Sequence, residues 1–396
     1  MTGRYASEVG VLDYVGPESG AGLDPRFSSW PTLLKAAGYR TGLIGKWHLG
    51  HSRPEHHPTR HGYEFFVGFL GGGVPARDPK LDTEAGPLKL TGLTDDLLTE
   101  HALRFLDERR DAPFLLSLHF RAPHKPYLPV TEQDWSHHRD RFTWAPQHPG
   151  VDPQTVQKEM KEYDASITGM DRNLGRVLAK LQELDLDQKT IVIFTSDHGY
   201  NVGHHGIWAK GNGVWLVDPP PPQLWPHITG KWRPNMWDTS LRVPLVIRWP
   251  GVVEPGSTVN QTVDFTDFFP TLCAMAGVRP PSDMPQRGRD FSPLLRGTGT
   301  AWENDLYAEY DMDHGGTSTH MRIWRTDRWK LMIDFKNPGR VELYDLRSDP
   351  QESRNLAEEN SAKIRQVRRT LTDKIVNRMR AIGDPVHKLA SQSATR

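Results

Sequence analysis

A chain of 396 residues, with 36% hydrophobic and 25% charged residues, is long enough for one large α/β domain and a smaller second one, and its composition argues against disorder. Lysine and arginine together number 49, as do aspartate and glutamate, so no overall charge draws the chain to nucleic acid or to an anionic membrane. The single cysteine, Cys273, excludes a disulfide framework and any zinc site built on several cysteines.

Two further observations limit the class of protein. The sequence has no run of about 20 apolar residues, the length that a helix needs to span a bilayer, and no signal pattern of basic and then apolar residues near its start. We therefore expect no membrane span, and the cellular compartment and the oligomeric state stay open. Cys273 lies in an apolar, helix-like run from Phe268 to Ala276, which is typical of a buried structural thiol and not of a nucleophile.

The first half of the chain alternates between short β-rich runs and segments with helical periodicity. A helix is predicted from Pro31 to Ala37, ended by Gly38, and a strand from Tyr39 to Ile44. A second strand is predicted from Phe114 to Phe120, and a long amphipathic helix from Val156 to Leu184. This alternation is typical of an α/β protein, in which helices cover the faces of a sheet.

The middle of the chain continues this pattern with one interruption. The run from Thr190 to Thr195 predicts a strand with both faces covered. The stretch from Gly211 to Arg233 contains four consecutive prolines and little periodicity, which predicts a long surface insertion. The strand pattern resumes from Val243 to Ile247.

The pattern changes after the glycine pair Gly315-Gly316. A charged helical tail is predicted from Ser361, and the three runs before it are typical of antiparallel strands: Met321 to Trp324, Trp329 to Asp334 and Val341 to Tyr344. The sequence therefore predicts the α/β class. We expect a large, mixed, mostly parallel sheet flanked by helices over residues 1–310, and a smaller C-terminal α+β subdomain over residues 311–396.

The most informative motif begins where the predicted strand ends at Thr195. Asp197 and His198 follow at the edge of the sheet where α/β proteins bind ligands. A carboxylate oxygen and an imidazole nitrogen there predict a divalent metal site, and Gly199 allows the backbone to turn away from it. Lys210 would place a cation beside an anion bound to that metal. The alternative is a solvated loop with incidental histidines, because two ligands alone do not make a metal site.

Two other predicted strands are followed by similar residues. Lys46 and His48 can bind a tetrahedral oxyanion, the lysine as a point charge and the histidine as a donor or acid. His124 lies between Pro123 and Pro126, which stiffen the backbone around it. Each motif alone is equally consistent with an ordinary surface turn. Three strand ends that carry histidine or lysine together predict one shared pocket.

In chain order, these motifs and several others resemble the formylglycine-dependent sulfatases of the alkaline phosphatase superfamily. The matching segments are Thr2 to Tyr5, Leu34 to Thr41, Gly45 to Gly50, His61 to Phe66, Gly68 to Gly72, Ala122 to Pro126, Thr195 to Gly199, Val263 to Leu272, Glu342 to Leu346, Asp349-Pro350 with Glu352, and Asn355-Leu356. They extend over almost the whole chain. The resemblance implies an alkaline phosphatase-like fold and hydrolysis of a sulfuric ester.

The resemblance also implies roles for individual residues. Asp197 and His198 would bind calcium, the latter at a position that is asparagine in many relatives. Contacts to the sulfate or the leaving oxygen would come from Lys46, His48, His124 and Lys210. Nitrogen is a poor ligand for a hard cation, so His198 leaves manganese or zinc open on chemical grounds, but Ca²⁺ is the metal that we expect.

One departure from the family pattern matters for activity. The family carries a Cys-x-Pro-Ser-Arg motif, whose cysteine becomes formylglycine, shortly before its Thr-Gly-Arg element, and two metal-binding aspartates further upstream. Here Thr2-Gly3-Arg4 opens the sequence. We therefore expect an N-terminally incomplete sulfatase domain without turnover, with weak calcium binding and a gap in its sheet where the strand with the aspartates would lie.

Three readings of the function remain. The first is a truncated form, or one with a misassigned start, of an active sulfatase that acts on a small-molecule or glycan sulfate ester. The second is a pseudoenzyme that binds sulfated glycans, and the third is a phosphoester or phosphonate-ester hydrolase. Retention of the six site residues favours the first. Tryptophans near the predicted insertion could stack on sugars or pack its own core. We expect His205 near the pocket but not on the metal.

Overall fold

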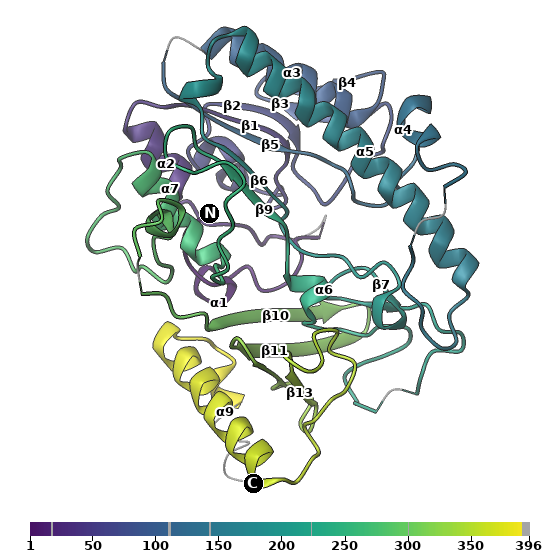
Figure 1. Ribbon diagram of the computed structural model, residues 1–396. Coiled ribbons are helices and arrows are strands. Elements are labelled where there is room, and N and C mark those ends of the chain that lie inside the picture. The colour runs from purple at the N-terminus through teal and green to yellow at the C-terminus, as the bar shows by residue number, and fades with distance from the viewer. Residues whose placement is uncertain (17–18, 110–111, 142–143, 223, 300, 390–396) are drawn as a thin grey trace.

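A computed structural model describes residues 1–16, 19–109, 112–141, 144–222, 224–299 and 301–389. A large sheet with its helices forms the upper part of Figure 1, and a smaller sheet with the last long helix forms the lower part. Within the described residues, no helix combines the length and the apolar character needed to cross a bilayer.

The central strand of the large sheet is β1 (Arg40–Lys46). It pairs in parallel with β2 (Phe65–Phe69) on one side and with β5 (Phe114–His119) on the other. Beyond β2, the antiparallel strands β3 (Lys80–Thr83) and β4 (Gly86–Lys89) complete a five-stranded sheet. The sheet is therefore mixed with a parallel core, as predicted, and β1 and β5 coincide with predicted strands.

Helices lie on both sides of this sheet (Figure 1). α3 (Thr94–Arg109) packs on β1 and β5, and α5 (Pro153–Glu183) packs on α3. On the other side, α2 (Trp30–Ala36) contacts β1 and α7 (Phe265–Met275) contacts α2. The long helix predicted from its apolar stripe is thus α5, and the buried Cys273 lies within α7, as expected of a structural thiol.

The two core clusters of this domain follow from the alternation of side chains along β1. Ile44 belongs to the cluster beneath α3 and α5, together with Phe105 of α3. Leu43 belongs to the cluster on the opposite face, together with Tyr63 and Phe66. Because successive residues of a strand point to opposite faces, an apolar run such as Leu43-Ile44 can serve both layers.

The carboxyl ends of the three parallel strands lie unusually close together. A Cβ added to Gly45 of β1 would lie 1.8 Å from the His119 carbonyl oxygen of β5, and one added to Gly68 of β2 would lie 1.9 Å from the Gly45 carbonyl oxygen. Gly45 also has a φ of 112°, which residues with a side chain rarely adopt. These glycines let three strand ends meet at the position of Lys46.

β6 (Val192–Thr195) and β9 (Leu245–Arg248) form a separate, antiparallel pair. Among the described residues, no strand pairing joins β6 to the edge strand β5. The sheet is therefore interrupted, as we expected. The prediction that β6 is covered on both faces was wrong, because all four of its residues are only half-buried. An apolar run indicates that a strand can be buried, but the element that would cover it belongs to a distant part of the chain.

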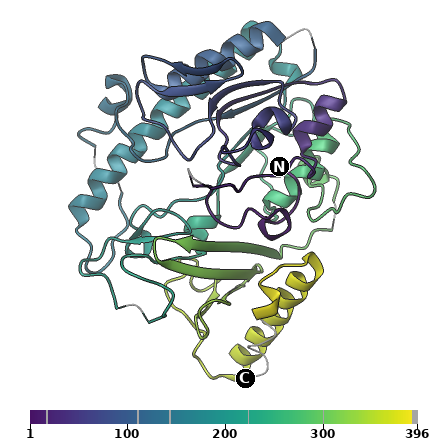
Figure 2. The same ribbon diagram turned by 180° about the vertical axis from the view of Figure 1, so that it is seen from behind.

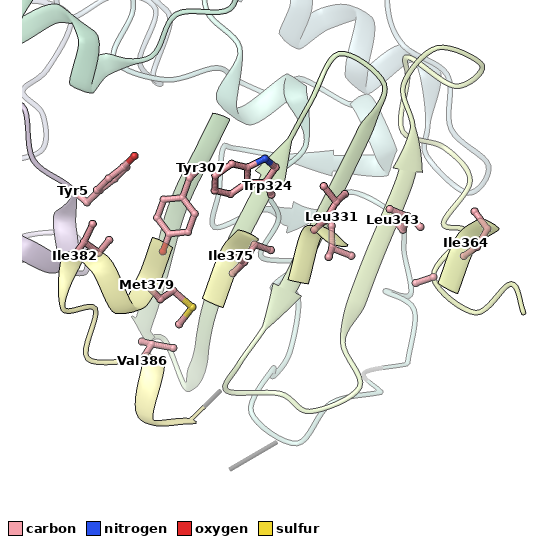
Figure 3. Packing of buried hydrophobic residues seen from close by; sticks show 12 residues of the cluster. Tyr5, Tyr307, Trp324, Leu331, Leu343, Ile364, Ile375, Met379, Ile382 and Val386 are labelled. Carbon is pink, nitrogen blue, oxygen red and sulfur yellow. The ribbon is translucent and has the colours of Figure 1, made fainter. Parts of the chain in front are cut away.

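The C-terminal subdomain is an antiparallel sheet covered by one helix. Its strands, in spatial order, are β10 (Leu306–His314), β11 (Thr317–Arg325), β12 (Trp329–Asp334) and β13 (Val341–Asp345). α9 (Ala362–Ile382) lies across one face, and Figure 3 shows its apolar residues against the sheet. β10 was not predicted, and it runs through residue 310, where the predicted division of the chain fell.

The opposite face of this small sheet packs on the large domain. Met321 and Ile323 of β11 and Met332 of β12 form a cluster with Met236, against which Leu241 also packs. The sheet therefore lies between α9 and most of the large domain, although Tyr5 of the N-terminal segment also packs on α9. Seen from behind in Figure 2, α9 lies at the outer end of the molecule.

The predicted surface insertion, residues 211–233, is bonded to the β10–β11 hairpin. Its Thr229 hydroxyl donates to the Gly316 carbonyl oxygen at 2.9 Å, and the Trp232 indole donates to the Gly315 carbonyl oxygen at 3.2 Å. A Cβ on Gly315 would lie 2.9 Å from the Trp232 ring. At least this tryptophan packs on the protein, which favours the packing reading of the tryptophan-rich insertion.

The remaining elements are short. They are α1 (Ala6–Val9), α4 (Glu132–Ser136), α6 (Asp238–Leu241), α8 (Ser292–Leu295), the strands β7 (Ile207–Trp208) and β8 (Val214–Trp215), and the 3₁₀ turns η1 (Pro54–His56), η2 (Pro58–Arg60), η3 (Asp187–Lys189) and η4 (His204–Gly206).

Candidate functional site

Lys46 and His48 lie at the carboxyl end of β1. Lys46 is the last residue of the strand and is half-buried. His48 has a φ of 54°, in the left-handed region, and its Nε2 lies 3.2 Å from the Val15 carbonyl oxygen. The close approach of β1 to its neighbours at Gly45 sets the direction in which both side chains leave the sheet.

β5 contributes two histidines. His119 ends the strand, is exposed, and has Nδ1 2.8 Å from the Lys46 carbonyl oxygen. His124 follows in the loop, and its Nδ1 lies 2.7 Å from the Lys125 carbonyl oxygen. These contacts leave the Nε2 atom of each ring as the one that can meet a ligand. Sequence reasoning missed His119, although a histidine at the carboxyl end of a predicted strand is the signal that identified the other positions.

A second group of residues follows β6. The His198 Nδ1 atom lies 2.8 Å from the Gly199 carbonyl oxygen, and its Nε2 lies 2.7 Å from the Lys210 ammonium. A neutral imidazole satisfies both contacts, since Nδ1–H donates to the carbonyl and Nε2 accepts from Lys210. The Asp197 carboxylate lies 3.4 Å from the same Nε2. Asp197, His198 and Lys210 thus form one contact group.

Gly199 is needed here for space and not for the turn that we predicted. Its φ is not among the positive values, but a Cβ would lie 2.3 Å from the Thr239 carbonyl oxygen. The Gly199 amide donates to the Ser240 carbonyl oxygen at 2.9 Å. The glycine therefore lets the segment after β6 lie against α6, which holds Asp197 and His198 in place.

The two lysines influence each other and Asp197. Burial lowers the pKa of Lys210 to about 8, the charge of Lys46 adds to this lowering, and Asp197 opposes it. Burial likewise lowers the pKa of Lys46, and Asp197 again opposes it. Partial burial works against ionisation of Asp197, but the charges of His198, Lys46 and Lys210 outweigh it and lower the pKa of that carboxyl. The Asp197 side chain is 67% exposed, so solvent screens this effect.

The pKa values of His48 and His124 depend on the charges of the same lysines. Burial lowers the pKa of His48 to about 4, and the charge of Lys46 contributes to the lowering. Partial burial together with Lys46 and Lys210 lowers the pKa of His124. Both imidazoles are therefore neutral at pH 7 in the free protein. An anion bound between the lysines would offset their charge and raise the pKa of both histidines.

The structure brings the six predicted residues together. Lys46 interacts electrostatically with His48, His124, Asp197 and Lys210, and His198 contacts Asp197 and Lys210 directly. They come from the ends of β1 and β6 and from the segments that follow β5 and β7 (Figure 1). Together they form a positively charged cluster with hydrogen-bonding groups, which suits a tetrahedral oxyanion.

Two glycines after β2 line this cluster. A Cβ on Gly72 would lie 3.0 Å from the His48 ring, and one on Gly73 would lie 4.0 Å from the His124 ring. In the sequence, Gly72 was notable only as part of the family resemblance. Nothing in a glycine pair by itself indicates that two imidazoles lie beside it.

The neighbouring histidines have other surroundings. His205 stacks on Trp237 with ring centroids 3.9 Å apart, and Arg233 and Glu342 act on its charge. His204 packs against the exposed Trp144. His205 is thus held by Trp237, and His204 by Trp144 in the segment before α5.

The metal ligands that are present do not fit a calcium site. Over the described part of the chain, no group of three or more His, Cys, Asp or Glu side chains is placed to hold a metal. Calcium takes about six to eight oxygen ligands. Asp197 offers one carboxylate, and the His198 Nε2 already accepts from Lys210. These two residues alone cannot supply a calcium coordination shell.

Comparison with known proteins identifies the family of the chain. A protein-family model described as sulfatase matches residues 1–278, and one described as N-sulphoglucosamine sulphohydrolase, C-terminal, matches residues 232–381. Steryl-sulfatase from Mus musculus is 27% identical over 93% of this chain and 71% of its own length. N-acetylglucosamine-6-O-sulfatase from Bacteroides thetaiotaomicron is 25% identical over 90% of this chain and 72% of its own. The chain spans only 63% of steryl-sulfatase from Rattus norvegicus.

Solved structures share the fold. One, described as a complex with its substrate D-glucosamine-2-N,6-O-disulfate, has a TM-score of 0.79 at 21% identity and covers 97% of this chain and 87% of its own. Another, from work on glycosaminoglycan metabolism by Bacteroides thetaiotaomicron, has a TM-score of 0.75 at 22% identity and covers 99% and 85%. The sulfatase model matches well over half of the residues. The chain belongs to the sulfatase family, and its fold is alkaline phosphatase-like.

Proposed function

We propose that this chain holds the substrate-binding and charge-stabilising part of a sulfuric ester hydrolase, and that its substrate is a carbohydrate sulfate. The observation that carries the proposal is the pair of ammonium groups, Lys46 and Lys210, placed around Asp197 with histidines on two sides. A sulfate ester carries its negative charge on three oxygens, so two cations and several N–H donors match it. Two similar proteins, an N-acetylglucosamine-6-O-sulfatase and one described in complex with D-glucosamine-2-N,6-O-disulfate, support the substrate class.

Each residue has a task in this proposal. Lys46 and Lys210 bind the sulfuryl oxygens and offset the charge that grows on them as the ester bond breaks. His124 or His48 gives a proton to the departing alkoxide. Bound sulfate offsets the charge of the lysines and so raises the pKa of both imidazoles, which favours the protonated form when substrate is present. His119 orients Lys46 through its contact with the Lys46 carbonyl oxygen.

The nucleophile is missing from this set. Cys273, the only cysteine, is buried in α7, and burial raises the pKa of its thiol to about 11. We propose that the formylglycine nucleophile and further metal ligands belong to a strand that fits between β5 and β6. Within the described residues, β5 has no strand partner beyond β1 and β6 none beyond β9, which supports this, and Asp197 after β6 lies near enough to His119 of β5 to act on its pKa. With those ligands added, Asp197 would join a calcium shell.

The decisive experiment compares two proteins. The coding DNA in frame before Met1 is read for a Cys-x-Pro-Ser-Arg run, and the extended protein is produced with a formylglycine-generating enzyme. The extended protein should hydrolyse 4-nitrophenyl sulfate, whereas residues 1–396 should show no turnover. Turnover by residues 1–396 alone, after removal of host sulfatases, would show that another nucleophile operates. A pseudoenzyme would bind N-acetylglucosamine 6-sulfate but remain inactive in both forms.

Calcium should have little effect on residues 1–396. If the dissociation constant is at or above about 1 mM, 100 µM calcium stabilises the fold by less than about 0.1 kcal/mol, too little to move a melting curve. The measurement is the melting temperature with and without calcium, and Asp197→Asn serves as the matched control. A rise of several degrees at micromolar calcium that Asp197→Asn abolishes would mean that this chain already contains a full ligand shell.

A further inference from the structure

We propose that the outer face of α9 is a second anion-binding site, which holds a sulfated polysaccharide away from the catalytic cluster. This rests on the proposed function for its substrate class. α9 carries seven lysines and arginines and one aspartate, a net charge of +6, in a chain whose net charge is zero. Such a local excess on one helix creates a positive surface that the overall charge conceals.

Three of the seven basic residues line a shallow hollow with a volume of about 300 Å³. It is lined by Arg365, Arg368, Arg369, Thr372 and Asp373. Residues three and four positions apart on a helix are neighbours on its surface, so Arg365 is a neighbour of both Arg368 and Arg369, and all three line the hollow. A guanidinium is a planar fork that binds an oxyanion through two N–H groups, which is the contact that a sulfate group needs.

These arginines keep most of their hydrogen-bonding capacity. Arg365 donates to the Asn360 side-chain oxygen at 2.8 Å, and Arg368 donates to the Ala357 carbonyl oxygen at 2.6 Å. Both acceptors are neutral oxygens, and each engages only one nitrogen of its guanidinium group. Within the described ranges, Arg365, Arg368 and Arg369 are in no ion pair with a carboxylate. Lys374 on the same helix differs, because it pairs with Asp305.

The chemistry of the hollow favours a sulfated glycan over other polyanions. A membrane-binding helix needs an exposed apolar face, but the apolar residues of α9, such as Ile375 and Met379, are buried against the small sheet (Figure 3). Single-stranded nucleic acid binds by stacking on aromatic rings, and the lining of this hollow is arginine, threonine and aspartate. A sulfated sugar unit needs only cations and hydroxyl-bonding groups.

The position of α9 suits a site that works together with the cluster and not in competition with it. The β10–β13 sheet lies between α9 and the large domain, so the two sites face different regions of the molecule (Figures 1 and 2). A polymer held at α9 would raise the concentration of its other sulfate groups near the cluster, whereas a monosaccharide sulfate would gain nothing.

The test measures affinity for dextran sulfate, with unsulfated dextran as the blank. Arg365→Gln, Arg368→Gln and Arg369→Gln are combined in one variant. The control combines Arg26→Gln, Arg60→Gln and Arg104→Gln, three exposed arginines elsewhere that change the net charge equally. We expect the α9 variant to lose about tenfold or more in affinity and the control less than about twofold, with melting temperatures unchanged.

The same proteins separate this inference from the proposed function. N-acetylglucosamine 6-sulfate should bind the α9 variant as it binds the parent, while Lys210→Ala should lose the monosaccharide and keep dextran sulfate. Equal losses in the two triple variants would overturn the α9 site. So would equally tight binding of duplex DNA or of phosphatidylserine vesicles, because the site would then not select sulfated glycans. If dextran sulfate depends on α9 but no monosaccharide sulfate binds at all, the proposed function fails and the α9 site stands.

Discussion

Replacing Asp384 by asparagine is expected to cost about 3–5 kcal/mol of the free energy of unfolding, because it removes the charge of a carboxylate that is hydrogen-bonded to a buried arginine. Arg322 of β11 is fully buried and donates to both carboxylate oxygens of Asp384, at 2.7 and 3.1 Å. It also donates to Asp311 at 2.9 and 3.2 Å and to the Met321 carbonyl oxygen at 2.9 Å, and the Glu309 carboxylate lies 4.0 Å away. Asp384 directly follows the Gly383 cap of α9, so this pair ties the end of the helix to the sheet.

Urea denaturation of the variant measures this cost. The exposed pair of Arg354 with Glu359 gives a matched control, and Arg354→Gln should cost less than about 1 kcal/mol. If Asp384→Asn also cost less than about 1 kcal/mol, then Asp311 and nearby water would suffice to compensate Arg322.

Replacing Lys210 by alanine is expected to weaken binding of N-acetylglucosamine 6-sulfate by about 30-fold or more, because a cation in direct contact with the bound anion is removed. The pH dependence should change as well. With the pKa of Lys210 at about 8 in the free protein, affinity should fall as the pH rises above 8 and the ammonium loses its proton. Lys210→Ala should abolish that fall in the same pH range.

Isothermal titration calorimetry across pH 6 to 10 measures both effects. Lys210→Arg keeps its charge throughout this range and should bind without the decline, although its planar group fits the position less well. His205→Ala is the matched control, since His205 stacks on Trp237 and not on the cluster. An undiminished pH decline in Lys210→Ala would assign the titration to Lys46, whose pKa burial also lowers.

Much of the fold follows from local patterns. The apolar stripe from Val156 to Leu184 predicts a helix whichever element packs against it, and the structure has α5 (Pro153–Glu183) there. The apolar run Leu43-Ile44 in β1 likewise predicts a strand, and its two side chains lie in the clusters on opposite faces of the sheet. Site residues were recognisable where they end strands, because the carboxyl edge of a parallel sheet collects ligands regardless of which strands pair.

The sequence by itself therefore determined several elements, such as β1, β5 and α5, the sulfatase resemblance and the residue types at the strand ends. Only the tertiary structure decided what depends on contacts between distant segments. It paired β6 with β9 and not with the parallel core, brought residues 211–233 onto the β10–β11 hairpin, and bonded His198 to Lys210. These outcomes depend on shape and charge complementarity across long separations in the chain, whereas periodicity and capping report only on a residue's own neighbours.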